Sequence, residues 1–164
     1  MTAGVAHRLN ALPAATARTE LTRCCGAERW VDRMLAARPF GSDAALFETA
    51  ERVWWQLAPS DWLAAFACHP RIGDHETPDE WSRAEQAGVA DAGTDVRRDL
   101  ARGNREYEAR FGHVFLICAT GRTADEMLGE LRRRLAHDAA TELRTAAAEQ
   151  AKITRLRLEK LGAS

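Results

Sequence analysis

The 164-residue sequence has no apolar run that approaches the ~20 residues a helix needs to cross a bilayer. It also has no excess of charge of one sign, since 23 lysines and arginines stand against 24 aspartates and glutamates. A near-neutral chain has no broad attraction to phosphate backbones or anionic lipid, so we expect neither nucleic acid nor a membrane as a partner. The length fits one compact domain over residues 1–164, because two halves would each bury too little surface.

Motifs of several common enzyme classes are missing. No GxSxG, glycine-rich phosphate loop or dinucleotide fingerprint occurs, which removes the commonest serine-hydrolase and nucleotide-binding classes. No CxxC, HxxxH or HExxH spacing occurs either. We therefore expect no metal site, although one short stretch holds Cys68, His69, Asp74, His75 and Glu76.

The two ends of the sequence carry no recognisable address. Residues 1–13 lack the apolar core and cleavage pattern of a secretion signal, and the final Gly-Ala-Ser differs from the Ser-Lys-Leu peroxisomal type. The four cysteines are expected to be reduced thiols, because the adjacent Cys24 and Cys25 suit a disulfide framework poorly. We therefore expect a cytoplasmic protein.

Apolar residues recur at helical spacing along most of the chain, which predicts an all-α, multi-helix bundle. These apolar stripes run through residues 30–35, 46–57, 62–66, 96–111, 127–135 and 143–161. Pro59 is expected to close one helix before Ser60 and Asp61 cap the next. Gly112 is expected to end the helix that Thr94 opens.

One stretch has the composition of a β-strand instead of a helix. Residues 114–119 form a β-branched and aromatic run that is too short for a helix, so we predict one short extended segment there. A lone strand leaves backbone amides and carbonyls unpaired.

Residues 68–81 form the main break in the helical pattern, because Pro70, Gly73 and Pro78 deny regular backbone pairing. His69 stands where an apolar stretch gives way to this loop, and a titrating group there suits acid–base work. On the residues alone, an ordinary hydrogen-bonded histidine is slightly favoured over a catalytic one.

Ser82-Arg83-Ala84-Glu85 matches a capping box, in which Ser82 and Glu85 would satisfy the first free amides of a helix. Gly88 should end that helix almost at once, however, so the box would stabilise very little secondary structure. A capping role and a functional role for Glu85 are equally well supported at this point.

Three polar residues fall on the apolar faces of predicted helices. Arg157 lies on the last apolar stripe, whereas Arg155 points to the opposite side. A buried guanidinium needs an anionic partner, and a protein carboxylate is favoured over a substrate carboxylate from geometry alone. Gln150 shares this inward face and suits either a core amide or a ligand donor. Asn104 lies on the stripe of residues 96–111, where a hydrogen bond to backbone is favoured over a ligand contact.

Two motifs stand close together in the sequence, His69-Pro70-Arg71-Ile72-Gly73-Asp74 and Ser82-x-x-Glu85-Gln86. With them the chain resembles the family of 2-oxo-4-hydroxy-4-carboxy-5-ureidoimidazoline (OHCU) decarboxylases. The resemblance continues in order along nearly the whole chain. It includes Leu9-Asn10, Cys24-Cys25-Gly26, Trp30, Arg38-Pro39-Phe40, Asn104-x-x-Tyr107-Glu108-x-x-Phe111-Gly112, Phe115-Leu116-Ile117-Cys118-Ala119-x-Gly121-Arg122 and Lys152-Ile153-Thr154-x-Leu156-Arg157-Leu158.

The resemblance implies an all-helical enzyme that converts OHCU into (S)-allantoin and carbon dioxide in urate degradation, without metal or organic cofactor. It assigns His69, Glu85 and Arg157 to catalysis. It places around the substrate Pro70, Ser82, Arg83, Ala84, Gln86, Phe115, Leu116, Ile117, Cys118 and Ala119. The expected partner is then a small ureide, which the unpaired backbone of residues 115–119 would face. A homodimer is also favoured, and five tryptophans exceed what one small core obviously needs.

The chemistry of such a reaction explains why no cofactor is expected. Loss of carbon dioxide leaves an electron pair, which the ring imine next to the carboxylated carbon of OHCU can accept. The protein then has to position the carboxylate and move protons. We expect His69 to take the hydroxyl proton or return a proton to carbon, and Glu85 to orient the ureido N–H groups or His69. A non-catalytic helical ligand-binding module is the alternative, and a metal-dependent amidohydrolase is a weaker third.

Overall fold

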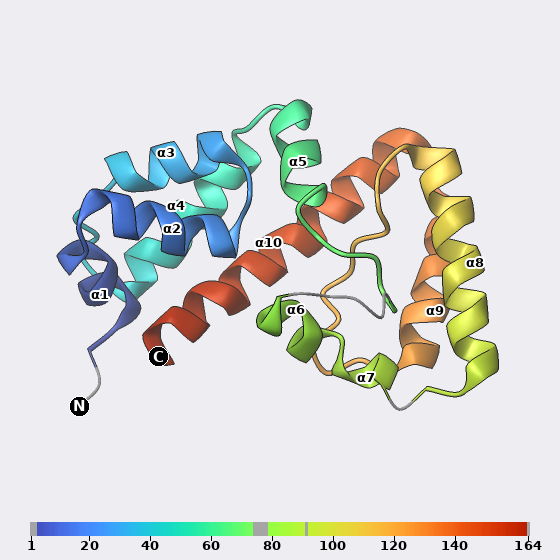
Figure 1. Cartoon of the computed structure of the whole chain (residues 1–164). Coiled ribbons are helices and arrows are strands. Elements are labelled where there is room, and N and C mark those ends of the chain that lie inside the picture. Colours follow the sequence, from blue (N-terminus) through green and yellow to red (C-terminus); the bar gives the residue numbers. More distant parts are fainter. Residues whose placement is uncertain (1–2, 74–78, 91, 164) are drawn as a thin grey trace. The chain divides into compact units, whose positions relative to one another are not determined.

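The computed structural model describes residues 3–73, 79–90 and 92–163, and over these residues it contains ten helices and no strand (Figure 1). The prediction of an all-α fold is therefore confirmed. None of the described helices is long and apolar enough to span a bilayer. The helices are α1 (Val5–Ala11), α2 (Ala14–Cys24), α3 (Glu28–Ala36), α4 (Asp43–Trp55), α5 (Pro59–Phe66), α6 (Glu80–Glu85), α7 (Ala87–Ala90), α8 (Thr94–Phe111), α9 (Ala124–Arg134) and α10 (Ala139–Ala163).

The chain divides into two compact units. The first unit comprises Met1–Ala65 with Gln150–Ser164, and the second comprises Phe66–Glu149. The first therefore holds α1 to α4, nearly all of α5 and the C-terminal part of α10, and the second holds α6 to α9 and the N-terminal part of α10. The division falls inside one continuous helix, and the expectation of a single domain stays a prediction.

Tryptophans form much of the core of the first unit. The fully buried indole of Trp30 donates its N–H to the carbonyl of Ala50 at 3.1 Å, and Trp62 donates to the carbonyl of Trp54 at 3.0 Å. The ring centroids of Trp54 and Trp62 lie 6.1 Å apart. A buried tryptophan whose N–H is paired brings a large apolar area to the core without an unsatisfied donor. These three tryptophans are thus accounted for within one chain.

Two helices begin earlier than the sequence pattern predicts. α5 starts at Pro59 rather than beyond it, because proline at the first helical position gives up no N–H that the helix would use. The Asp61 carboxylate then reaches back to accept the N–H of Ala58 at 3.3 Å. α10 starts before its apolar stripe, because the Asp138 carboxylate accepts the N–H of Thr141 at 2.7 Å and so pairs one of the free amides of the first turn.

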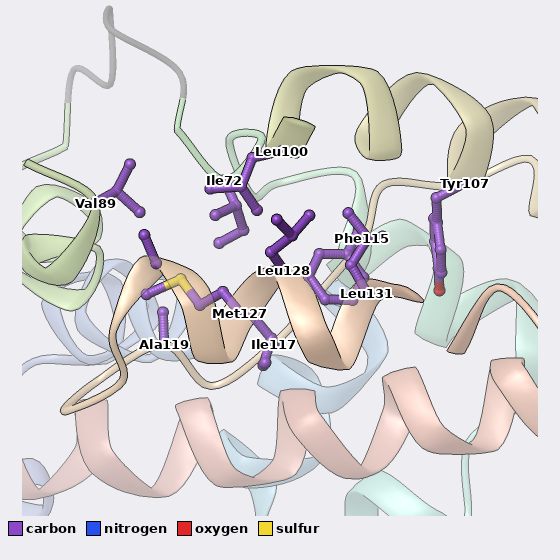
Figure 2. Packing of buried hydrophobic residues seen from close by; sticks show 11 residues of the cluster. Ile72, Val89, Leu100, Tyr107, Phe115, Ile117, Ala119, Met127, Leu128 and Leu131 are labelled. Carbon is purple, nitrogen blue, oxygen red and sulfur yellow. The ribbon is translucent and has the colours of Figure 1, made fainter. Parts of the chain in front are cut away.

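The core of the second unit gathers α8, α9 and the non-helical residues 114–119 around one cluster of buried side chains (Figure 2). The cluster consists of Ile72, Val89, Leu100, Tyr107, Phe115, Ile117, Ala119, Ala124, Met127, Leu128 and Leu131. α8 ends at Gly112, whose φ of 79° gives the left-handed conformation that glycine adopts at a helix C-terminus. The predicted stop at this glycine is confirmed.

α8 and α9 approach each other closely at Gly103. A Cβ at this position would overlap the side chain of Leu131, which is fully buried in α9. Gly129, in α9 itself, has open space where its Cβ would lie. The first glycine therefore lets two helices pack, whereas the second only weakens its own helix.

We expect Gly103→Ala and Gly129→Ala to change stability in opposite directions. Replacing glycine with alanine in a helix interior raises the free energy of unfolding by about 1 kcal/mol. At Gly103 this gain is outweighed by overpacking against Leu131, which costs about 1–3 kcal/mol. Urea unfolding followed by far-ultraviolet circular dichroism measures both variants. A Gly103→Ala protein as stable as Gly129→Ala would contradict the close packing of α8 on α9.

Candidate active site

His69 lies on a loop that follows α5 and is held by its neighbours at several points. The backbone N–H of His69 donates to the carbonyl of Phe66 at 3.1 Å, and its side chain is half-buried. Two residues further on, the Arg71 guanidinium donates to Glu108 of α8 at 2.7 Å. Ile72 then places its side chain in the hydrophobic cluster of the second unit. The loop is thus fixed on α8 by one ion pair and one buried side chain.

Two side-chain amides hold the backbone at the end of this loop. Asn104, buried on α8, donates its amide N–H to the carbonyl of Ile72 at 2.9 Å. This confirms the interpretation of Asn104 as a tie between two segments. Gln86 accepts the backbone N–H of Gly73 at 3.0 Å through its side-chain oxygen. Gly73 has a φ of 86°, a conformation in which any other L residue would be strained.

The helix that carries Glu85 does not begin where the sequence predicted. The N-cap of α6 is Asp79, whose carboxylate accepts both the backbone N–H and the hydroxyl of Ser82 at 3.0 Å. Ser82 is therefore a buried residue inside the helix, and of the two alternatives the capping box that starts at Ser82 is ruled out, because Asp79 is the N-cap. Glu85 stands at the last position of α6, where it cannot cap the helix start.

A pocket of about 510 Å³ lies beside Glu85 within the second unit. Its size falls within the ~300–1,000 Å³ typical of small-molecule sites. The wall is built by α6, α7, the start of α8 and the turn that leads into α9. It consists of Ala84, Glu85, Ala87, Gly88, Ala92, Gly93, Val96, Gly121, Arg122, Thr123, Ala124 and Asp125.

The segment 114–119 has no regular secondary structure, but its backbone is not open for a ligand in the way the sequence suggested. The carbonyl of Leu116 accepts a hydrogen bond from Arg134 at 2.7 Å. The N–H of Cys118 donates to the Glu149 carboxylate at 3.2 Å. The prediction of an unpaired edge is therefore wrong for these two groups, since charged side chains take the place of a neighbouring strand. The side chains of Phe115, Leu116, Ile117 and Ala119 are buried, and that of Cys118 is half-buried.

An ion pair between Arg134 of α9 and Glu142 of α10 lies at the centre of the second unit. Both side chains are 0% exposed, and the Arg134 Nε donates to Glu142 Oε1 at 2.6 Å. The hydroxyl of Tyr107 donates to the same oxygen at 2.8 Å, and burial raises the pKa of this phenol well above its usual range. The Arg134 guanidinium also lies over the ring of Phe115, 4.7 Å from its centroid. Sequence analysis missed this pair, although both residues stand on inward faces of their helices.

In the first unit, Arg157 stabilises the C-terminal end of α2. It is 8% exposed, as its position on the apolar face predicted, and it donates to the carbonyl of Arg23 at 2.9 Å. Thr154 donates to the next carbonyl, that of Cys24, at 3.3 Å, and accepts the side-chain N–H of the fully buried Gln150 at 2.9 Å. These bonds satisfy carbonyls that the end of a helix leaves without partners. Burial raises the pKa of the Cys24 thiol to about 12, although the positive charge of Arg157 acts to lower it. This thiol therefore stays protonated at neutral pH.

The second unit brings together two of the predicted functional segments. The loop of His69 and the segment of Glu85 are joined through the hydrogen bond between Gly73 and Gln86. Pro70 is half-buried beside His69, while Arg83 and Ala84 are exposed on α6. Arg157 belongs to the first unit. The metal alternative involved Asp74, His75 and Glu76, which lie outside the described residues.

The described residues form an all-helical protein whose second unit holds a pocket bordered by the Glu85 carboxylate, and the residue after Glu85 is hydrogen-bonded to the loop that carries His69. The family model described as OHCU decarboxylase matches residues 10–159. The chain belongs to the OHCU decarboxylase family, a family of decarboxylases.

Similar proteins agree with this assignment. The chain is 38% identical over 146 residues to the uric acid degradation bifunctional protein TTL of Arabidopsis thaliana, a match that covers 84% of the chain and 45% of that protein. It is 30% identical to 2-oxo-4-hydroxy-4-carboxy-5-ureidoimidazoline decarboxylase of Haloferax volcanii, with 79% of each chain covered. A crystal structure of OHCU decarboxylase in the presence of (S)-allantoin superposes with a TM-score of 0.78 at 40% identity, covering 88% of this chain and 98% of that one. The chain spans less than two thirds of the length of the first curated relatives it matches.

The buried ion pair at the centre of the second unit should tolerate the loss of both partners better than the loss of one. Glu142→Leu and Arg134→Met each leave a buried charge unpaired, and we expect each to lose about 3–5 kcal/mol of unfolding free energy. The double variant should lose less than the sum of the two, because it leaves no unpaired charge.

The matched control for these variants is Glu130→Leu, which breaks an exposed pair with Arg133 on the same α9 helix. An exposed pair contributes about 0–1 kcal/mol, so this variant should remain close to wild type in urea unfolding. If Glu142→Leu were as stable as Glu130→Leu, the central role of the buried pair would be contradicted.

Proposed function

We propose that the chain decarboxylates OHCU to (S)-allantoin and carbon dioxide, a step in the breakdown of urate. The observation that carries this proposal is the likeness, at 40% identity and over 88% of the chain, to an OHCU decarboxylase whose crystal structure was determined in the presence of (S)-allantoin. The match of the family model to residues 10–159 supports the same activity.

The reaction balances without an added electron acceptor. The bond between the ring carbon and the carboxylate breaks, carbon dioxide leaves, and the electron pair moves toward the ring imine. The hydroxyl oxygen loses its proton as it becomes a carbonyl, while the former imine nitrogen and the carbon that bears the ureido group each gain one, so one proton is taken up overall as the carboxylate leaves as carbon dioxide. The protein is then required to position the substrate and to deliver and remove protons, and we propose that it does so without metal or organic cofactor.

His69 is the proposed proton carrier. It stands on a loop whose Arg71 pairs with Glu108 and whose backbone is held at Ile72 and Gly73, and imidazole is a side chain suited to proton transfer near neutrality. Glu85, which has no role in capping α6 and borders the pocket, is proposed to orient the ureido N–H groups or His69. An acid–base residue on an anchored loop avoids the loss of entropy that ordering it during the reaction would cost.

The remaining site assignments rest more heavily on the family resemblance. Arg157 is proposed as the partner of the substrate carboxylate on that basis alone. The substrate would also meet residues among Pro70, Ser82 to Ala84 and Phe115 to Ala119. In the last segment, the N–H and carbonyl of Ile117 have no hydrogen-bond partner among the described residues and could serve a ureide.

Replacing His69 with Asn should nearly abolish enzymatic formation of allantoin. Removal of a general acid–base residue costs about 10²–10⁴-fold in rate, and we expect kcat to fall within this range. Ultraviolet absorbance of freshly prepared OHCU measures its decay, and circular dichroism measures whether one allantoin enantiomer accumulates. The control is His7→Asn, at an exposed histidine of α1. Near-wild-type turnover by His69→Asn would contradict the role of His69. A wild-type protein that binds allantoin without accelerating OHCU decay would be a ligand-binding module, which would contradict the proposed function itself.

We also propose that the protein is a cytoplasmic homodimer. All four cysteines are free thiols, which suits a reducing compartment.

Trp55 and Leu63, in α4 and α5, stay 36% and 40% exposed, and large exposed apolar side chains are typical of protein interfaces. Leu63→Asp should therefore give a monomer in sedimentation velocity experiments, whereas Ser60→Asp, at an exposed position of the same helix, should not. A wild-type protein whose sedimentation gives a mass of 18.1 kDa, that of one chain, would contradict the dimer.

A further inference from the structure

The backbone around Ile117 is held by charged side chains that bond to its two neighbours. Arg134 donates to the carbonyl of Leu116 at 2.7 Å, and the Glu149 carboxylate accepts the N–H of Cys118 at 3.2 Å. The N–H and carbonyl of Ile117 lie between these two bonds and have no hydrogen-bond partner among the described residues. The side chain of Ile117 belongs to the hydrophobic cluster of the second unit, so packing holds this residue as well.

These two bonds also determine where the backbone groups of Ile117 point. A trans peptide unit is planar, and its carbonyl and its N–H point in opposite directions. Both peptide bonds of Ile117 are trans, because the one cis bond of the described chain lies between α3 and α4. The carbonyl of Ile117 shares a peptide unit with the N–H of Cys118, so it points away from Glu149. The N–H of Ile117 shares a unit with the carbonyl of Leu116, so it points away from Arg134.

The two charged side chains differ in what else they hold. Arg134 is one half of the buried ion pair with Glu142, so its replacement is expected to affect the whole second unit. Glu149 lies further along α10, is 4% exposed and is not a member of that ion pair. The peptide unit between Ile117 and Cys118 can therefore be released by a change at Glu149 that leaves the central pair in place.

The groups of Ile117 match the chemistry of a ureide. Backbone groups of folded proteins are nearly always paired, and here a donor for the carbonyl and an acceptor for the N–H are both missing among the described residues. A ureido group carries N–H donors and a carbonyl acceptor. A backbone group whose direction is set before the ligand arrives loses little entropy on binding, which favours affinity.

We propose that Glu149 is a positioning residue for the ureide site. It holds the peptide unit between Ile117 and Cys118 so that the carbonyl of Ile117 is directed at an N–H of the ligand, and it does not itself touch the ligand. This inference rests on the proposed function, in which the ureide meets the segment 115–119.

The first test needs no variant. The carbonyl-carbon NMR signal of Ile117 should move downfield when (S)-allantoin is added to the wild-type protein, because the carbonyl then accepts a hydrogen bond. The signal of Ala11, at the exposed end of α1, should stay unchanged and is the control. An Ile117 signal that does not respond to saturating allantoin would overturn the proposal.

The second test compares two replacements of Glu149. Glu149→Met has a similar length but no strong acceptor, whereas Glu149→Gln keeps a side-chain oxygen for the N–H of Cys118. We expect Glu149→Met to raise KM and the inhibition constant of (S)-allantoin together, by about 3- to 10-fold, because one hydrogen bond to the ligand is weakened in ground state and transition state alike. Its kcat should stay within about twofold of wild type. Glu149→Gln should stay within about twofold in all three constants.

A purely structural role of Glu149 would give a different result. Loss of folded protein lowers the apparent kcat and leaves KM unchanged, so the rise in KM separates the two roles. Hydrogen exchange of the Cys118 amide should also accelerate in Glu149→Met and stay near wild type in Glu149→Gln. The matched control is Glu159→Met, at an exposed glutamate of the same helix that pairs with Arg155, which should change neither KM nor this exchange rate.

Thermal unfolding of each variant verifies that the fold is intact. If Glu149→Met does not fold, Glu149→Asp takes its place, because it keeps the charge but is one methylene too short to reach the N–H of Cys118. The same rise in KM is then expected.

The outcomes separate this inference from the proposed function. A wild-type protein that neither consumes OHCU nor binds allantoin overturns both. A wild type that binds allantoin with the expected response at Ile117, but does not accelerate OHCU decay, overturns the proposed function and supports the positioning role. An active wild type with an unchanged KM in Glu149→Met overturns the positioning role alone. Equal impairment of Glu149→Met and Glu149→Gln overturns it as well, because the acceptor would then not be what matters.

Discussion

The ion pair between Arg134 and Glu142 is the interaction on which the rest of the second unit depends. Transfer of two charges out of water is costly, and their attraction offsets that cost only where the remaining donors and acceptors are also paired. Here the pairing extends outward, because Tyr107 donates to the same carboxylate and Arg134 donates to the carbonyl of Leu116. His137 adds a contact of 3.2 Å to the other carboxylate oxygen. The pair therefore connects α8, α9, α10 and the segment 114–119 through specific bonds.

The consequence for the candidate site is that a piece of irregular backbone can be buried. Residues 114–119 have no partner strand among the described residues, and buried backbone groups without partners are costly. Arg134 and Glu149 act as substitutes for such a strand at Leu116 and Cys118. The Arg134 guanidinium donates to the carbonyl of Leu116 and to the Glu142 carboxylate at once, and hydrogen bonds with an ionised partner are stronger than neutral ones.

Sequence periodicity predicted α3, α4, α5, α8, α9 and α10 because their apolar faces are nearly continuous, but it did not predict α1 or α2. The inward positions of Arg157, Gln150 and Asn104 were also predictable, since each interrupts such a face. What could not be predicted were the contacts that join distant segments. The cap of α6 depends on whether Asp79 or Ser82 turns toward the free amides, and the backbone path before the helix decides this. The partners of Arg134 depend on the approach of α9 to α10, about which spacing within either helix carries no information.

One rule unites the inward polar side chains and limits what burial can imply about function. Asn104 holds the carbonyl of Ile72, Arg134 holds that of Leu116, and Arg157 holds that of Arg23, so in each case a polar group on an apolar face satisfies backbone that no helix can pair. An inward arginine is therefore explained by the fold before any ligand is considered. His69 and Glu85 differ in kind, because both are only half-buried, and Glu85 lines a pocket. The proposal that Glu85 acts on a substrate therefore rests on its partial exposure at a pocket, whereas burial of a charge such as Arg134 is explained by the backbone that it pairs.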